Sequence, residues 1–270
     1  MVFGGFFGRL KRGFSIALTS FGVLREHPSL LVLPLVAGAA SILYLAALVG
    51  GVFLVGMPEQ TAPQVAIAFV YYAGTTFIAA FFNAGLVAAA RTHFRGEEPS
   101  LRGALAAAWD HKGTLAVYAL IAATVSLLLR AIENADERIG RIVSWILGAA
   151  WTILTYFVIP VIVFEDVGPL EMFKRSGSLF RDTWGETIGI GAGVAVMQLL
   201  LVLPGILLAV GLVLFVPNVG LLVGVAIGAA VIVLGFLAGT AMIAVAKTAL
   251  YLYAEEGTVP AEFTEEQLSG

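Results

Sequence analysis

Long runs of apolar residues dominate the chain, and the longest of them extends from Thr187 to Ala246. It contains sixty residues without one Asp, Glu, Lys or Arg. Its strongest interruption is the turn-forming sequence Pro-Asn-Val-Gly at 217–220, close to its middle. One helix that crosses a hydrocarbon core of ~30 Å needs ~20 apolar residues. The stretch therefore predicts two membrane crossings joined by a turn.

The same pattern of apolar runs recurs along the chain and predicts six membrane-spanning helices. Backbone N–H and C=O groups in hydrocarbon find partners only inside helices or closed barrels, and runs of this length favour helices. The predicted fold class is therefore an all-α integral membrane protein. The expected spans are 29–57, 64–95, 113–132, 142–164, 186–216 and 221–254.

Three shorter segments, at 3–26, 100–111 and 169–183, combine apolar and charged positions at helical spacing. Each precedes a pair of expected spans, so we expect three helical hairpins, each led by an amphipathic helix. The first of these helices either faces the protein core or lies in the headgroup region, and its basic residues opposite aromatics favour the headgroups. Ser100 predicts an N-cap for the second. The aromatic residues expected at the membrane interface are Phe7, Phe14, Phe173 and Phe180.

Basic residues lie mainly on one side of the expected membrane. Twelve of the fifteen Lys and Arg fall in the first amphipathic helix, at the end of the second span or in the link after it, in the link after the fourth span, or at the end of the last span. Cytoplasmic loops carry the excess of basic residues in membrane proteins. We therefore expect both termini to be cytoplasmic, in a multi-pass protein of the plasma membrane.

Three links along the chain share an acidic, glycine-containing sequence that ends in proline. They follow the second, fourth and sixth spans, at 96–99, 166–169 and 256–260. This recurrence predicts an internal repeat of three units. The expected organisation is one membrane domain at 1–257, with repeat units at about 1–95, 96–164 and 165–257, an acidic tail at 258–270, and a candidate stub of a fourth amphipathic helix at 261–268.

Small residues in the last span recur at spacings of four and seven. At 100° per residue they fall within a wedge of roughly 60°, which allows close approach of a neighbouring helix. We expect helix packing at Gly224, Gly228, Gly235 and Gly239.

Four other residues inside the spans are candidates for a ligand site or a transport path: Asn83, Gln198, Pro204 and Lys247. A structural role is favoured for each of them. Asn and Gln in hydrocarbon usually form interhelical hydrogen bonds, and proline kinks a helix. Lys247 is placed to extend its ammonium into the headgroups.

Composition and missing motifs exclude several classes of function. Apolar residues make up 60% of the chain and charged residues 12%, so little of it is left for a soluble domain. The three histidines match no metal-ligand spacing, there is no cysteine, and no nucleophile–base motif occurs. We expect no enzymatic activity, no metal and no cofactor. Because membrane topology explains the basic residues, we also expect no nucleic-acid partner.

Four short parts of the sequence carry a resemblance: Phe7–Gly13, Phe82–Ala84, Val167–Pro169 with Lys174–Ser176, and Tyr253–Pro260. They resemble an uncharacterised family of prokaryotic six-helix membrane proteins, over nearly the whole chain. That family is similar to the membrane domain that accompanies some glycerophosphodiester phosphodiesterases. The catalytic domain of those enzymes has no counterpart in the sequence, so the resemblance implies the six-helix architecture and no activity.

Two functions remain open at this point. The favoured hypothesis is a non-enzymatic protein with a lipid-interacting or scaffolding role, whose amphipathic helices form a collar at the cytoplasmic leaflet. The alternative is a permease or channel for a lipid-like or neutral solute. Membrane lipids are the expected partners, and the sequence leaves a protein partner or a homo-oligomer open.

Overall fold

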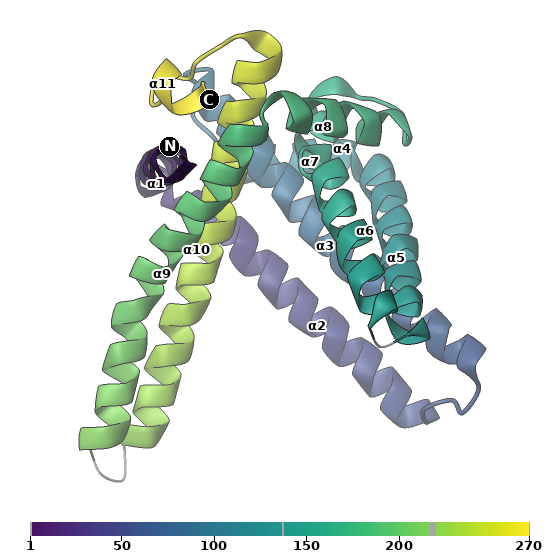
Figure 1. Ribbon diagram of the computed structural model, residues 1–270. Helices are drawn as coiled ribbons and strands as arrows, with labels where there is room; N and C mark the ends of the chain where they lie inside the picture. The colour runs from purple at the N-terminus through teal and green to yellow at the C-terminus, as the bar shows by residue number, and fades with distance from the viewer. Residues whose placement is uncertain (1, 137, 217–219, 270) are drawn as a thin grey trace. The chain divides into compact units, whose positions relative to one another are not determined.

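The described part of the chain, residues 2–136, 138–216 and 220–269, is built from helices and contains no strand in this computed structural model (Figure 1). Among these described residues, six helical segments are long and apolar enough to cross a membrane, by length and composition. They are Pro28–Val55, Thr61–Phe94, Lys112–Ala135, Ile139–Glu165, Gly189–Phe215 and Leu222–Glu256. The predictions of an all-α fold and of six apolar spans are confirmed, and a multi-pass membrane protein follows.

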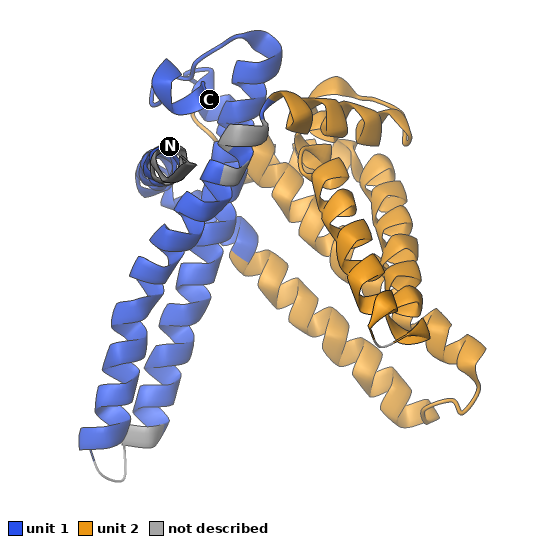
Figure 2. Ribbon diagram, in the orientation of Figure 1, with its two compact units in different colours: residues 1–34, 90–97, 183–270 blue, residues 35–89, 98–182 orange. Residues whose placement is uncertain are grey.

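The helices divide into two compact units, which Figure 2 colours separately. Residues 1–34, 90–97 and 183–270 form unit 1, and residues 35–89 and 98–182 form unit 2. Unit 1 holds α1 (Val2–Glu26), η1 (Pro28–Leu31), α9 (Trp184–Phe215), α10 (Gly220–Glu256) and α11 (Glu265–Leu268). Unit 2 holds α4 (Leu101–Asp110), α5 (Lys112–Ala135), α6 (Ile139–Thr155), α7 (Val158–Glu165) and α8 (Glu171–Asp182). Two further helices, α2 (Val32–Val55) and α3 (Thr61–Phe94), lie mostly in unit 2 and have one end in unit 1.

In unit 1, α9 and α10 pack along their lengths at a line of small residues (Figure 1). A Cβ built on Gly224 would lie 2.7 Å from the carbonyl oxygen of Ala209, and one on Gly228 would lie 2.8 Å from the Cβ of Ala209. Farther along α10, a Cβ on Gly235 would meet Val202 and one on Gly239 would lie 2.9 Å from the Cδ of Gln198. All four glycines that the sequence analysis singled out therefore face α9.

Helix α1 packs against α9 and α10, and the closest approach again occurs at glycines. A Cβ on Gly13 would overlap the backbone of Gly189, and one on Gly193 would overlap the backbone of Gly13. The buried face of α1 continues through Ile16, Ala17, Ser20, Val23 and Leu24. Phe14 and Phe21, two aromatic residues of the same helix, are only half-buried. Small residues thus decide which side of α1 meets its neighbours, because only they allow the backbones to touch.

Unit 2 contains a break within the fourth expected span. We expected one helix over 142–164, but α6 ends at Thr155 and α7 begins at Val158. The break lies one turn before Pro160, which has no N–H and whose ring clashes with the carbonyl four residues earlier. At the break, the buried N–H of Phe157 donates to the Oγ of Ser176 on α8, at 2.9 Å. Pro204, by contrast, lies inside a continuous α9.

Helix α8 packs against α6 and α7 through its aromatic side. The ring of Phe173 lies 5.4 Å from that of Trp151, and the ring of Phe180 lies 5.5 Å from that of Tyr156. Both phenylalanines are buried, so these two residues of the expected interface contact protein in unit 2. Phe14 is half-buried on α1, and the side chain of Phe7 lies outside the described residues.

The segment that follows α10 docks on unit 1. Gln267 Nε2 donates to Ser15 Oγ at 2.7 Å and to Thr19 Oγ1 at 3.3 Å. Phe263 and Leu268 are buried, and the ring of Phe263 lies 5.9 Å from that of Phe94. The acidic tail expected at 258–270 therefore includes a docked segment, and α11 lies within the range expected for a helical stub.

We predict that Gly228→Leu lowers the free energy of unfolding by ~1–3 kcal/mol, because the larger side chain forces α10 away from Ala209. The higher helix propensity of Leu compared with Gly would offset at most ~1 kcal/mol of this loss. The measurement is chemical or thermal unfolding in detergent. Gly211→Leu on α9 is the matched control, since a Cβ there meets nothing within 4 Å. Equal stabilities for the two variants would show that α9 and α10 do not pack at this line.

Candidate functional site

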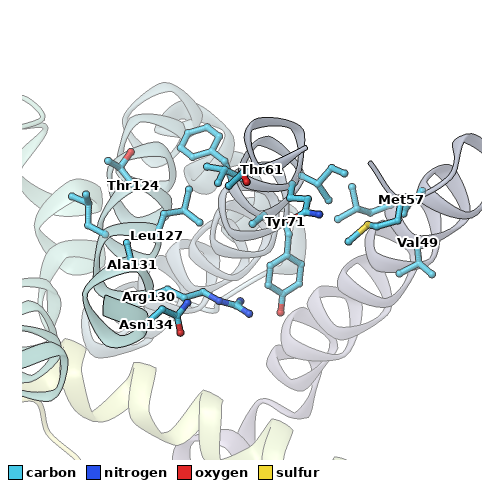
Figure 3. Close-up of a pocket in the computed structure, with 17 residues that line it drawn as sticks. Val49, Met57, Thr61, Tyr71, Thr124, Leu127, Arg130, Ala131 and Asn134 are labelled. Carbon is cyan, nitrogen blue, oxygen red and sulfur yellow. The ribbon is translucent and has the colours of Figure 1, made fainter. Parts of the chain in front are cut away.

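Unit 2 contains a cavity of about 1040 Å³ between α2, α3 and α5 (Figure 3). Ligand pockets in proteins commonly measure ~300–1,000 Å³, so this volume suits a ligand with a long apolar part. The cavity lies beside the link that joins α2 to α3, which contributes Met57. All residues that line it belong to unit 2.

Tyr44 on α2 helps to set the spacing of the helices beside the cavity. Its hydroxyl donates a hydrogen bond to the carbonyl of Val70 on α3. Its ring lies against Gly74, where an added Cβ would overlap it. The Tyr44 ring, which lies between the two helices against Gly74, sets the distance between α2 and α3 at this level. The next turns of α2, at Leu48, Val49 and Val52, then line the cavity.

The wall of the cavity is mainly apolar and has polar side chains in a few places. Arg130 is the one charged residue among the described residues that line it. The uncharged polar residues are Thr61, Gln64, Tyr71, Thr124 and Asn134. In Figure 3 the guanidinium of Arg130 extends from α5 toward the side of the cavity where Tyr71 lies. A largely apolar space with one fixed cation matches an amphiphile whose polar end is anionic.

Arg130 lies in the last turns of α5 and keeps most of its binding capacity. Its Nη1 donates to the hydroxyl of Tyr72 at 3.3 Å. Among hydrogen bonds between described residues, this one uses a single N–H of the five donors in the guanidinium. The side chain is exposed at the cavity, so a phosphate or carboxylate there would reach it without displacing an ion pair.

Asp136 lies two residues beyond Asn134 and is already engaged elsewhere. Its Oδ1 accepts hydrogen bonds from the backbone N–H of Ile139 at 2.7 Å and of Arg138 at 2.9 Å. These hydrogen bonds, the one from Ile139 foremost, favour the charged carboxylate and hold the pKa of Asp136 below its usual value. The carboxylate thus provides a partner for two backbone N–H groups at the start of α6.

None of the four residues expected to line a path lies at this cavity. Asn83 is half-buried on α3 in unit 2. The other three belong to unit 1, where Gln198 lies against Gly239, Pro204 is exposed and Lys247 is half-buried on α10. The structure thus distributes these residues over both units.

Sequence reasoning missed two polar residues of the lining: Arg130 lay near the end of the third expected span and was not singled out, and Asn134 lay beyond the end of that span at residue 132. The structure extends α5 to Ala135. The available signal was the spacing of Thr124, Leu127, Ala131 and Asn134, which places them on one helical face together with Leu128. That face lines the cavity.

The chemistry of the lining favours binding. The described lining residues offer hydroxyls, amides and a guanidinium, and they include no His, Asp, Glu or Lys that could act as a general base. These groups are chemically suited to contact an anionic group and an apolar chain.

Comparison with known proteins identifies a family and nothing further. No curated protein and no solved structure matches the chain. The expected kinship with the membrane domain of glycerophosphodiester phosphodiesterases is not shown and stays a prediction. One family model, described as "Family of unknown function (DUF6159)", matches residues 62–261, about three quarters of the 270 residues. The chain therefore belongs to DUF6159, a family of unknown function.

Proposed function

We propose that this chain is a non-enzymatic membrane protein that binds a lipid with an anionic headgroup in the cavity between α2, α3 and α5. The observation that carries the proposal is an apolar cavity of about 1040 Å³ in which Arg130 is the one charged residue among the described lining. Within a bilayer, such a space between apolar helices is filled most favourably by an acyl chain.

The position of Arg130 on α5 supports an amphiphilic ligand. Helix α5 runs from Lys112 to Ala135, so Arg130 lies about 27 Å along it at 1.5 Å per residue. That distance approaches the thickness of a hydrocarbon core, and it puts the guanidinium near one headgroup layer. A lipid whose chains lie along Leu127 and Leu128 would bring its headgroup to the same level.

A permease for a lipid-like solute is the second candidate. The cavity supports it to the extent that a bound lipid is a first step of transport. A path across the membrane also needs polar groups along its length, and Asn83, Gln198, Pro204 and Lys247 lie away from this cavity. Binding is therefore the better-supported function, and a scaffolding role for the lipid-loaded protein is compatible with it.

We predict that Arg130→Gln lowers the retention of anionic phospholipid by about tenfold, since a charge-assisted contact contributes on the order of 1.5 kcal/mol. The measurement is native mass spectrometry of the protein released from nanodiscs that contain equal amounts of phosphatidylglycerol and phosphatidylcholine. Arg141→Gln is the matched control, because Arg141 is exposed on α6 and does not line the cavity.

A second variant tests the apolar part of the site. Ala68→Trp places a large side chain into the cavity from α3 and is expected to lower retention of both lipids. Unchanged retention in both Arg130→Gln and Ala68→Trp would overturn the proposal. Lipid movement between leaflets of proteoliposomes, lost in the same variants, would favour the permease.

We further infer that both termini are cytoplasmic in the plasma membrane, as the basic residues indicate. Because the chain contains no cysteine, single-cysteine variants report orientation without a background. In intact cells, an impermeant maleimide is expected to label Glu59→Cys in the link between α2 and α3. It should label Glu98→Cys, in the link after α3, only after permeabilisation. The reverse pattern would invert the topology.

We also infer three repeated units, each an amphipathic helix followed by two spans. The conformation of the three links supports this inference. A residue with positive φ follows the end of α3, α7 and α10 in turn: Gly96 at 77°, Asp166 at 48° and Gly257 at 62°. Each link then leads to a short helix, and Ser100 caps α4 by accepting the N–H of Gly103, as predicted.

We predict that Gly96→Ala and Gly257→Ala each lower the free energy of unfolding by ~1–2 kcal/mol, because a Cβ is strained in the left-handed region. Asp166→Gly is expected to have the opposite sign, since it relieves that strain. Gly113→Ala, in α5 with open space around it, is the control and should be neutral or slightly stabilising. If the two link glycines behave like Gly113 in thermal unfolding, the links do not share this turn.

A further inference from the structure

Two histidines that are far apart in the sequence meet in unit 1. His27 lies between α1 and η1, and His93 lies in the last turn of α3. The Nε2 of His27 is 3.0 Å from the Nδ1 of His93, and the two rings are nearly perpendicular with centroids 4.8 Å apart. Both side chains are half-buried. One nitrogen from each ring therefore lies close enough to the other for both to contact the same small ligand.

A carboxylate completes a set of three metal-ligating groups. One donor atom each from Glu26, His27 and His93 lies within 4.8 Å of the other two. Zinc binds histidine nitrogens and carboxylate oxygens at ~2.0–2.2 Å, so tetrahedral donors lie about 3.4 Å apart. Glu26 is exposed at the end of α1. A rotation of its flexible side chain would shorten the donor separation from within 4.8 Å toward the tetrahedral value.

The second nitrogen of His93 faces a second carboxylate. Its Nε2 is buried and lies 3.0 Å from Oε1 of Glu262, at an angle outside hydrogen-bonding geometry. Histidines that ligate a metal through one nitrogen usually donate the other N–H to a carboxylate, which fixes the ring and its tautomer. Glu262 is placed for that role, because it approaches His93 from the side opposite His27.

The chain brings these groups together from three separate segments. Pro28 ends α1 directly after His27, whose backbone leaves the helical region at φ −122° and ψ 67°. The left-handed residue Gly257 turns the chain after α10, and Phe263 then packs on Phe94 beside His93. The site therefore depends on the docked segment after α10 as well as on α1 and α3.

We propose that Glu26, His27 and His93 bind a divalent transition-metal ion, with zinc as the best chemical match, and that Glu262 positions His93 for binding. Two imidazoles and one carboxylate suit zinc, and they leave a fourth coordination position open. This proposal is independent of the lipid cavity. It departs from the expectation of no metal, which rested on spacing along the sequence.

The test uses the full chain, purified in detergent through a tag without histidine. Calorimetric titration with zinc is expected to give one saturable site per chain, and titration with cobalt should give the visible absorption of a tetrahedral ion. His27→Ala and His93→Ala are each expected to weaken zinc binding at least 100-fold. His111→Ala, which removes the remaining histidine, is the matched control and should bind like the parent chain.

Two additional variants separate binding from folding. Glu262→Gln should weaken zinc binding ~10–100-fold, as for the loss of an orienting carboxylate. His27→Gln keeps a side-chain amide that can hydrogen-bond to His93 but removes the imidazole ligand. It is expected to elute from size exclusion like the parent chain and to lose the cobalt absorption. Metal binding should also protect the segment 257–269 from proteolysis, and this protection should be weaker in Glu262→Gln.

Two results would overturn the proposal. The first is the absence of saturable zinc binding by the parent chain, which would leave the two rings as a hydrogen-bonded pair. The second is zinc binding that persists in a His27→Ala/His93→Ala double variant, or that falls equally in His111→Ala. Either result would place metal affinity away from the two histidines.

Discussion

Direct contact between helix backbones is the constraint on which unit 1 depends. Lipid is as apolar as the side chains that face it, so burial alone does not drive helices together within a bilayer. Dispersion forces over closely matched surfaces must supply the attraction, and these forces fall steeply with distance. Glycine provides the closest match, and it lies where α1 meets α9, at Gly13, Gly189 and Gly193. The line from Gly224 to Gly239 provides the same closeness between α9 and α10.

Unit 2 satisfies its backbone in a different way. A proline inside a span disrupts the helical hydrogen bonds, and a lost partner is costly where no water is present. A side chain from α8 replaces a lost backbone partner: the buried N–H of Phe157 donates a hydrogen bond to the Oγ of Ser176. Arg175, the residue before Ser176, forms an ion pair with Glu165 at 2.7 Å and links α8 to the end of α7. Phe173 and Phe180 then close the aromatic contacts around α6.

Element type and span number were predictable from the sequence, whereas the partners of each face were not. Apolar length and the spacing of charges are local properties, and they decide where a helix crosses. The periodicity of apolar residues shows which side of a helix is apolar, but it does not show which other helix packs against that side. On α1, Phe14 and Phe21 are only half-buried, whereas Ile16, Ala17 and Ser20 beside them are buried. The contact between His27 and His93 was not predicted for the same reason: it depends on which helices are neighbours, and the two residues are 66 positions apart in the sequence.

The charged residues and histidines of both proposed sites lie near the ends of helices or in the links between them. The middles of the spans hold apolar and small residues, and a charge there costs several kcal/mol. Arg130 lies near the end of α5, where we propose that its guanidinium reaches a headgroup layer. His27, His93 and Glu262 lie at the ends of α1 and α3 and in the segment after α10. Under the proposed topology, α3 and α5 end on opposite sides of the membrane. The proposed lipid site and the proposed metal site share no residue, so variants can test each of them separately.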